Sequence, residues 1–292
     1  MGSVLHSRSE LPDSTPRSFS LRRSIFSLTV IWLLVLTSFL FWRGTWFGRP
    51  LSEQQLDTYL HDSNPSHVQH ALLQVGNRMA HNDPAVKVWY SELVHLSTAA
   101  NEEIRATDAQ VMGEDPARPE FRQALRPMLG DESLAVRQQA ALSLARFGDS
   151  AGHDVIVALL RPWIVQAPRP GRVLGLAMPG TNISSRNGVV ATLDSGGKVV
   201  EVHPPFAGKI GTLAVKPGET VAAGAELVTL DASGDDVWRA LHALAIIGRP
   251  EDLPLVSPYT KVSVLTAERV RQQAILTDKA IRQRYLGSSE KR

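Results

Sequence analysis

Histidine is the residue type in this sequence best suited to metal or acid–base chemistry, and the chain has nine of them. His67 and His70 are three residues apart, with His61 and Asp62 just upstream, so a helix would carry the two later histidines on one face. A zinc site needs at least three protein ligands, and the sequence contains no His-Glu-x-x-His motif. We therefore predict histidines at the surface and no metal site.

Other sequence motifs that are typical of catalytic sites are also missing. His153-Asp154 and His203 suggest a zinc peptidase, but the paired His-x-His of such enzymes is not present. The chain has no cysteine, which excludes disulfides, cysteine-ligated metals and thiol catalysis. It has no Gly-x-Ser-x-Gly, P-loop or dinucleotide motif. The sequence predicts no catalytic residue and no cofactor, and hence that the chain is not an enzyme.

Three pairs of adjacent acidic residues lie in loops or where helices are predicted to begin: Glu102-Glu103, Glu114-Asp115 and Asp235-Asp236. Carboxylates at a helix N-terminus complement the helix dipole, so we interpret these pairs as structural.

Charge is unevenly distributed along the 292 residues. The chain has 31 basic and 29 acidic residues, of which residues 1–50 hold six and two. The remainder has 25 basic against 27 acidic residues, so the basic character belongs to the N-terminus. A basic N-terminal segment alone does not indicate nucleic acid, and we predict no nucleic-acid partner.

The N-terminal segment predicts a membrane anchor. Ser24–Trp42 is a run of 19 residues without a charge, which as a helix spans about 28 Å, close to the hydrocarbon thickness of a bilayer. The alternative is a cleaved signal peptide, but aromatic residues follow where a cleavage site would lie. Four arginines precede the run and two follow it: Arg8, Arg17, Arg22 and Arg23, then Arg43 and Arg49. The positive-inside rule then predicts that residues 1–23 are a cytoplasmic tail of a single-pass bacterial inner-membrane protein, with the bulk of the chain periplasmic.

The body of the chain contains helical repeats. Four apolar helical stretches end in a hydrophobic residue and a glycine, at Gly76, Gly113, Gly148 and Gly248. The first two intervals, 37 and 35 residues, fit helix–turn–helix repeats, each of which must stack on a neighbour.

One copy is clearer than the others. In residues 121–163, Asp131 occupies the turn between two amphipathic stretches, and Val136-Arg137 opens the second. This copy resembles the HEAT-like repeat family. Weaker matches to the same pattern begin at Asp83 and Asp236. The resemblance covers about residues 53–162 and 235–285. A basic C-terminal helix over residues 265–286 would complete the region 235–286, and it would cap the solenoid or bind a partner or a membrane surface. The resemblance implies a binding surface or scaffold.

The third interval, of 100 residues, holds an insertion rich in glycine, proline and short β-branched runs. Residues 164–194 and 199–231 share a sequence pattern. Each half contains a Pro-Gly pair, Pro179-Gly180 in the first and Pro217-Gly218 in the second, and each ends in Thr-Leu-Asp. We therefore predict an internally duplicated all-β unit over residues 163–232.

The second half of this unit carries Val202, Gly208, Gly218, Val221 and Leu230-Asp231. It resembles the biotinyl/lipoyl-like barrel-sandwich that periplasmic adaptor proteins also use. The resemblance implies structural turns, which we place at Gly171, Gly180, Gly208 and Gly218. The long helical hairpin of many adaptors is missing between the halves.

Carrier proteins of that family attach their cofactor to a hairpin lysine, and the hairpin here would be Asp194–Lys198. Lys198 lies one residue later than the family pattern places its lysine, so we predict no cofactor and keep attachment to Lys198 as the alternative.

The sequence thus predicts an α+β multidomain protein: an N-terminal transmembrane helix, then an α-solenoid of HEAT-like repeats interrupted by an all-β barrel-sandwich hybrid. We predict an extracytoplasmic scaffold or adaptor that binds the membrane and other envelope proteins, for secretion, efflux or polysaccharide export. The alternatives are a carrier with lipoate or biotin on Lys198, and an envelope enzyme without a recognisable motif.

Overall fold

The computed structural model describes residues 50–185, 187–262 and 266–286. The predicted span Ser24–Trp42 and the predicted tail 1–23 lie outside these residues. Among the helices that are described, none combines the length and the apolar character needed to cross a bilayer.

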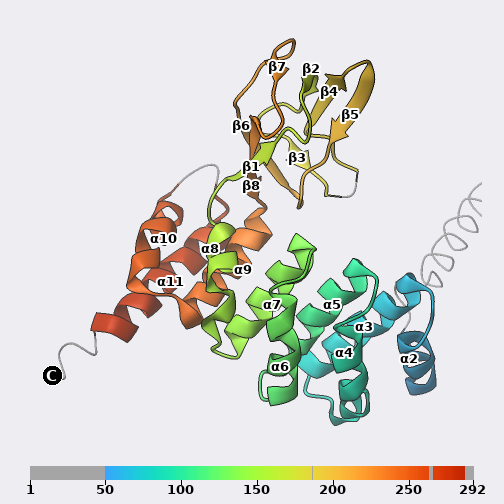
Figure 1. Cartoon of the computed structure of the whole chain (residues 1–292). Coiled ribbons are helices and arrows are strands. Elements are labelled where there is room, and N and C mark those ends of the chain that lie inside the picture. Colours follow the sequence, from blue (N-terminus) through green and yellow to red (C-terminus); the bar gives the residue numbers. More distant parts are fainter. Residues whose placement is uncertain (1–49, 186, 263–265, 287–292) are drawn as a thin grey trace, which may run out of the picture. The chain divides into compact units, whose positions relative to one another are not determined.

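Helices form five successive pairs in the described part of the chain (Figure 1). The first helix of each pair packs on the second, and the second helices α3, α5, α7, α9 and α11 pack side by side in that order. The five pairs are α2 (Glu53–Leu60) with α3 (Pro65–Ala80), α4 (Tyr90–Leu96) with α5 (Glu102–Met112), α6 (Pro119–Met128) with α7 (Leu134–Arg146), α8 (His153–Ala158) with α9 (Gly234–Ile247), and α10 (Leu253–Thr260) with α11 (Glu268–Leu286). Short 3₁₀ turns precede α4, α8 and α10: η2 (Pro84–Trp89), η3 (Ser150–Gly152) and η4 (Pro250–Asp252). Each pair buries its apolar faces against its neighbours, as solenoid repeats do.

Capping residues in the sequence explain where several helices begin. The side chains of Ser52, Asn64, Asn101 and Ser233 accept hydrogen bonds from backbone N–H groups in the first turns of α2, α3, α5 and α9. Glycine marks most of the predicted helix ends, and Gly148 adopts a positive φ of 68° just after α7.

Gly76 is the exception, because α3 continues past it to Ala80. A Cβ at this position would lie 3.0 Å from Val111 Cγ2 of α5. The glycine here permits two helices to approach closely; it does not end a helix.

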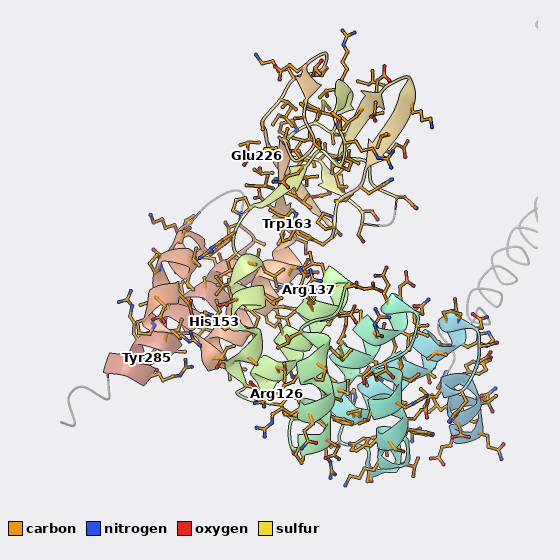
Figure 2. All side chains as sticks on the ribbon, in the orientation of Figure 1. Arg126, Arg137, His153, Trp163, Glu226 and Tyr285 are labelled. Atoms are coloured by element: carbon orange, nitrogen blue, oxygen red, sulfur yellow. The ribbon has the colours of Figure 1, made fainter. Side chains whose placement is uncertain are left out.

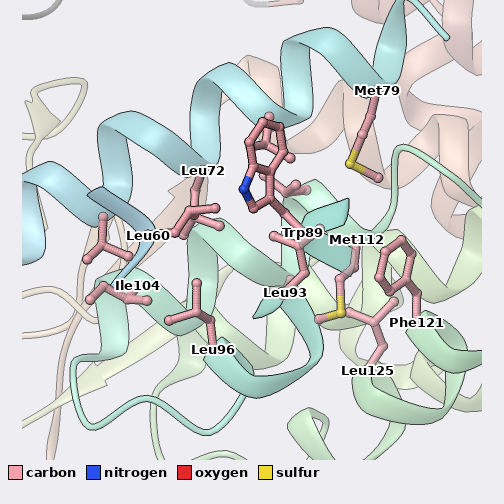
Figure 3. Close-up of a cluster of buried hydrophobic side chains, with 14 of the residues drawn as sticks. Leu60, Leu72, Met79, Trp89, Leu93, Leu96, Ile104, Met112, Phe121 and Leu125 are labelled. Carbon is pink, nitrogen blue, oxygen red and sulfur yellow. The ribbon is translucent and has the colours of Figure 1, made fainter. Parts of the chain in front are cut away.

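The helical core is continuous through α7. One apolar cluster joins α2 through α7, and Figure 3 shows part of it around Trp89, Met112 and Phe121. A second cluster joins α7 through α11. Ala140 and Leu144 of α7 belong to the first cluster, whereas Ala141 and Ala145 belong to the second.

The inserted residues form two four-stranded antiparallel sheets around one apolar core. One sheet has the order β1-β8-β6-β3 and the other β5-β4-β2-β7. The strands are β1 (Trp163–Gln166), β2 (Gly171–Leu176), β3 (Asn182–Ile183), β4 (Ala191–Ser195), β5 (Lys198–Val202), β6 (Gly208–Leu213), β7 (Thr220–Val221) and β8 (Glu226–Ala232). The predicted barrel is therefore corrected: the described strands pair within two separate sheets and do not close into a barrel.

The order of the strands shows the internal duplication. Each sheet takes two strands from the first half of the insertion, β1 to β4, and two from the second, β5 to β8. Exchanging each strand for its counterpart in the other half converts the order β1-β8-β6-β3 into β5-β4-β2-β7. The two halves therefore interlock, and neither sheet can form from one half alone.

The insertion replaces the turn inside the fourth helix pair. β1 follows α8, and β8 leads into α9 (Figure 1). The two strands are antiparallel neighbours, with Trp163 opposite Leu230, so the chain leaves and re-enters the helical part at adjacent points.

Candidate interaction surface

Asp131 and Arg137, the predicted repeat-turn residues, fix the turn between α6 and α7. Asp131 Oδ1 accepts a hydrogen bond from the Ser133 N–H at 2.8 Å. Arg105 of α5 donates to both carboxylate oxygens of Asp131, at 2.7 and 2.9 Å. Arg137, which is labelled in Figure 2, donates to the carbonyl oxygens of Asp131 and Glu132, at 2.6 and 2.9 Å. These contacts are structural, and the Arg105 guanidinium, hydrogen-bonded to Asp131, lowers the pKa of that carboxyl.

Three further aspartates play the same part in the turns between pairs. Each accepts a hydrogen bond from the N–H two residues later and pairs with an arginine: Asp83 with Arg78, Asp115 with Arg118, and Asp149 with Arg126. Asp83 and Asp115 open the sequence Asp-Pro-Ala, and Asp149 opens Asp-Ser-Ala. The sequence already indicates Asp83 as a repeat position, and the recurring Asp-x-Ala pattern is the signal that could also have identified Asp115 and Asp149.

The four glycines predicted as turns occupy two kinds of position. Gly180 and Gly218 have φ of 84° and 94° and lie in turns. Gly171 and Gly208 instead begin β2 and β6. There a Cβ would collide with the carbonyl oxygen of Asp194 or Asp231, respectively, at equivalent points of the two halves.

Lys198 is exposed at the start of β5. Gly196 and Gly197, with φ of 64° and 82°, form the two-residue turn before it. Asp194 Oδ1 closes this turn by accepting a hydrogen bond from the Gly197 N–H at 2.8 Å.

The histidines do not gather into one site. His61 Nε2 lies 3.3 Å from a Glu92 oxygen, and His67 Nδ1 lies 2.5 Å from Asp62 Oδ2. His70 is buried beside Gln74, which corrects the prediction that it lies at the surface. In the described ranges no three metal-ligating side chains converge.

The second helices share an exposed surface, which we call the second-helix face. Side-chain contacts cross it between each neighbouring pair: Gln69 to Glu103, Glu114 to Arg146, Gln139 to Arg239, and Asp235 to Arg269. These links join α3 to α5, the turn after α5 to α7, α7 to α9, and α9 to α11.

A pocket of about 350 Å³ opens on this face between α5, α7 and α9. It is lined by Gln110, Glu114, Gln139, Leu142, Ser143, Arg146, Trp238, Arg239, His242 and Ala243. Ser143 Oγ donates to the Ala109 carbonyl at 2.7 Å. A Cβ at Gly113 would lie 2.5 Å from that Oγ, so the glycine allows α5 and α7 to approach at the base of the pocket.

Stacking holds the aromatic wall of the pocket in place. The rings of Trp238 and His242 are 5.4 Å apart and within 7° of parallel. The Arg269 guanidinium lies 5.2 Å from the Trp238 ring centroid, in cation–π geometry. We call this cavity the Trp238 pocket.

A larger pocket of about 820 Å³ lies where the β strands join the helices. Its lining includes Arg161, Lys209, Asp231, Asp235 and Tyr259. Burial, and to a lesser extent the Asp231 charge, raise the pKa of Tyr259.

Comparison with known proteins identifies the repeats. A family model described as HEAT repeats matches residues 91–167. These residues include the turn at Asp131 and Arg137, from which the sequence predicts a repeat of this type. A comparison with proteins of curated function found no match.

Two solved structures share features with the chain. The complex of CpcE and CpcF of phycocyanin lyase from Nostoc sp. PCC7120 matches with 16% identity and a TM-score of 0.42, covering 83% of this chain and 68% of that one. A single-chain, multi-domain long-chain acyl-CoA carboxylase matches with 17% identity and a TM-score of 0.24, covering 48% of this chain and 16% of that one.

The first of these neighbours corrects one prediction. The sequence predicts that the chain is not an enzyme, and this is contradicted by similarity to part of a lyase. At a TM-score of 0.42, the similarity assigns no reaction to this chain.

Proposed function

We propose that the chain is a membrane-anchored adaptor that binds partner proteins through its HEAT repeats. The observation that carries this proposal is the second-helix face. Side-chain hydrogen bonds connect its helices, and the Trp238 pocket opens on it. Pre-organised surfaces bind at a lower entropic cost than mobile ones. A scaffold role is also what the resemblance to HEAT-like repeats implies.

The proposed location is the bacterial inner membrane. The uncharged run Ser24–Trp42 would be the anchor, and the arginine excess before it would keep residues 1–23 in the cytoplasm. The remaining chain would lie in the periplasm and meet other envelope proteins.

We infer that the β insertion, residues 163–232 between repeat regions 53–162 and 235–286, is of the biotinyl/lipoyl type found in periplasmic adaptors. The interlocked halves support this inference, and so do Gly171 and Gly208 at equivalent positions. An adaptor of secretion, efflux or polysaccharide export would combine such a unit with an interaction surface.

Fractionation and affinity purification test this proposal. The tagged full-length protein should resist extraction from membranes by alkaline carbonate, and protease added to spheroplasts should digest residues after 50. Purified in mild detergent, it should retain an envelope protein at fixed stoichiometry. A chain that carbonate releases, or that purifies alone at every detergent strength tested, overturns the adaptor proposal.

A second candidate function is that of a carrier with lipoate or biotin on Lys198. The observation in its favour is the exposed position of Lys198 directly after a tight Gly196-Gly197 turn. Intact mass spectrometry decides it, because attachment adds a discrete mass that the Lys198→Arg variant lacks. Identical modification states in wild type and variant exclude the carrier.

A further inference from the structure

The side chains that line the Trp238 pocket limit the kind of ligand that it can bind. The inference about this ligand rests on the proposed function as an interaction protein. The charged groups of the pocket already have partners. Arg146 donates to both oxygens of Glu114, at 2.7 and 2.9 Å. Arg239 donates to Asp236 at the pocket edge and to Gln139 Oε1 at 3.4 Å. These pairs are partly exposed at the surface, but they leave no charged side chain of the pocket lining without a partner. The lining therefore offers no free counter-charge to a charged ligand, and we expect an uncharged one.

The remaining lining combines apolar surface with side-chain amides. Leu142 and Ala243 contribute aliphatic surface, and the indole of Trp238 contributes an aromatic wall. Gln110 is exposed, and the Gln139 amide NH₂ is not used in its bond to Arg239. Each amide offers both a donor and an acceptor, the combination that complements a peptide backbone.

The volume of the pocket limits the size of the ligand that it can hold. About 350 Å³ is near the lower end of the range for ligand pockets. Such a volume suits one or two residues of a partner.

We propose that the Trp238 pocket binds one uncharged apolar or aromatic side chain from an extended segment of a partner protein, and that Gln110 and Gln139 hydrogen-bond the backbone on either side of it. The stacked Trp238 and His242 rings form its aromatic wall, and the existing ion pairs leave no free counter-charge for an acidic or basic anchor.

Selection of peptides on the purified full-length protein in detergent tests this. A library of random 12-residue peptides displayed on phage should yield binders with an apolar or aromatic residue at one fixed position. Fluorescence polarisation of the labelled peptides should then show at least tenfold weaker binding to Gln110→Ala/Gln139→Ala and to Leu142→Glu. Replacing the anchor residue by Asp or Lys in the peptide should weaken binding to the wild type by at least tenfold.

Matched controls lie outside the pocket. Gln123→Ala on α6 and Leu73→Glu on α3 alter exposed residues of the same types and should bind within twofold of the wild type. Circular dichroism establishes whether each variant keeps the helical content of the wild type. A variant that loses helical content is replaced by another substitution at the same position.

The outcomes separate this inference from the adaptor proposal. Failure to select any peptide, or equal binding by pocket variants and controls, overturns the inference about the pocket. The adaptor proposal still stands in that case if the protein purifies with an envelope partner. Pocket-dependent peptides without an envelope partner support the inference and overturn the proposed envelope role.

Discussion

Asp108 is a residue whose chemistry conflicts with its position. It lies on α5, its side chain is fully buried, and neither carboxylate oxygen has a hydrogen-bond partner among the described residues. Burial, with a smaller contribution from the charge of Glu92, raises the pKa of Asp108 well above its usual value. Burial in the folded protein therefore disfavours the charged form of this acid, at a cost to stability.

Asp108→Leu should stabilise the protein, because leucine has the same branched shape without unsatisfied polar atoms. We expect the free energy of unfolding at neutral pH to rise by about 1–3 kcal/mol. The raised folded-state pKa means that wild-type stability falls as pH increases from about 4, where the unfolded carboxyl ionises, through the folded-state pKa. The advantage of Asp108→Leu should therefore grow over that interval.

Urea unfolding between pH 4 and 8 measures both effects. A variant less stable than the wild type throughout this range would show that Asp108 has a favourable contact in the folded state.

Asp131 has the opposite pH behaviour, because the Arg105 guanidinium lowers the pKa of its carboxyl. Asp131→Asn keeps a side-chain oxygen for the Ser133 N–H but removes the charge from a pair whose side chains are only 12% and 10% exposed. Breaking a pair this deeply buried costs about 3 kcal/mol. Stability from a lowered pKa is present above about pH 4 and is lost as pH falls through the folded-state value.

The difference in unfolding free energy between wild type and Asp131→Asn should thus shrink below pH 4, as chemical denaturation at pH 3, 5 and 7 would show. A difference that is constant with pH would mean that the hydrogen-bond geometry, and not the charge, stabilises the turn.

At the scale of elements, a buried pair joins the helices on either side of the insertion. His153 Nε2 at the start of α8 lies 2.9 Å from Asp252 Oδ2 at the end of η4, and both side chains are less than 10% exposed. Asp252 Oδ2 also accepts a hydrogen bond from the Arg249 N–H at 2.8 Å. The pair therefore connects two first-helix segments 99 residues apart in the chain.

His153→Ala should leave the Asp252 carboxylate buried with its side-chain partner removed, and lower the free energy of unfolding by about 1–3 kcal/mol. Hydrogen exchange should show faster exchange in α8 and α10 and unchanged exchange in α3 and α5. Equal acceleration in all four helices would mean that the pair acts on the whole solenoid.

Local sequence features predicted much of this fold. Helical periodicity predicted helices on both sides of the insertion, and the duplicated Pro-Gly pattern predicted its two halves. Gly76 shows where local reasoning fails, since its role depends on Val111 of another helix. Asp131 could be recognised as a turn residue, but not its partner Arg105, because that contact depends on the stacking of pairs. The Trp238 pocket could not be predicted, since Gln139 and Trp238 meet across the insertion.

At the scale of the whole molecule, the insertion and the helices have separate cores. The cluster inside the two sheets draws its buried members from residues 165–230, and the buried members of the two helical clusters come from outside that range. The neighbouring strands β1 and β8 bring Trp163 opposite Leu230, and such Cα atoms are about 5 Å apart. A few residues are long enough to join the helical ends directly.

Replacing residues 163–232 by a four-residue Gly-Ser linker between Pro162 and Ser233 should therefore leave the helical part folded. The variant should keep a cooperative thermal transition and lose only the strand contribution to its circular dichroism. Because α8 and α9 contact each other directly and share the cluster of α7 to α11, the linker needs only to close their turn. A molten or aggregated variant would instead show that the β unit supplies contacts on which the fourth helix pair depends, and the insertion would then be an integral part of the solenoid.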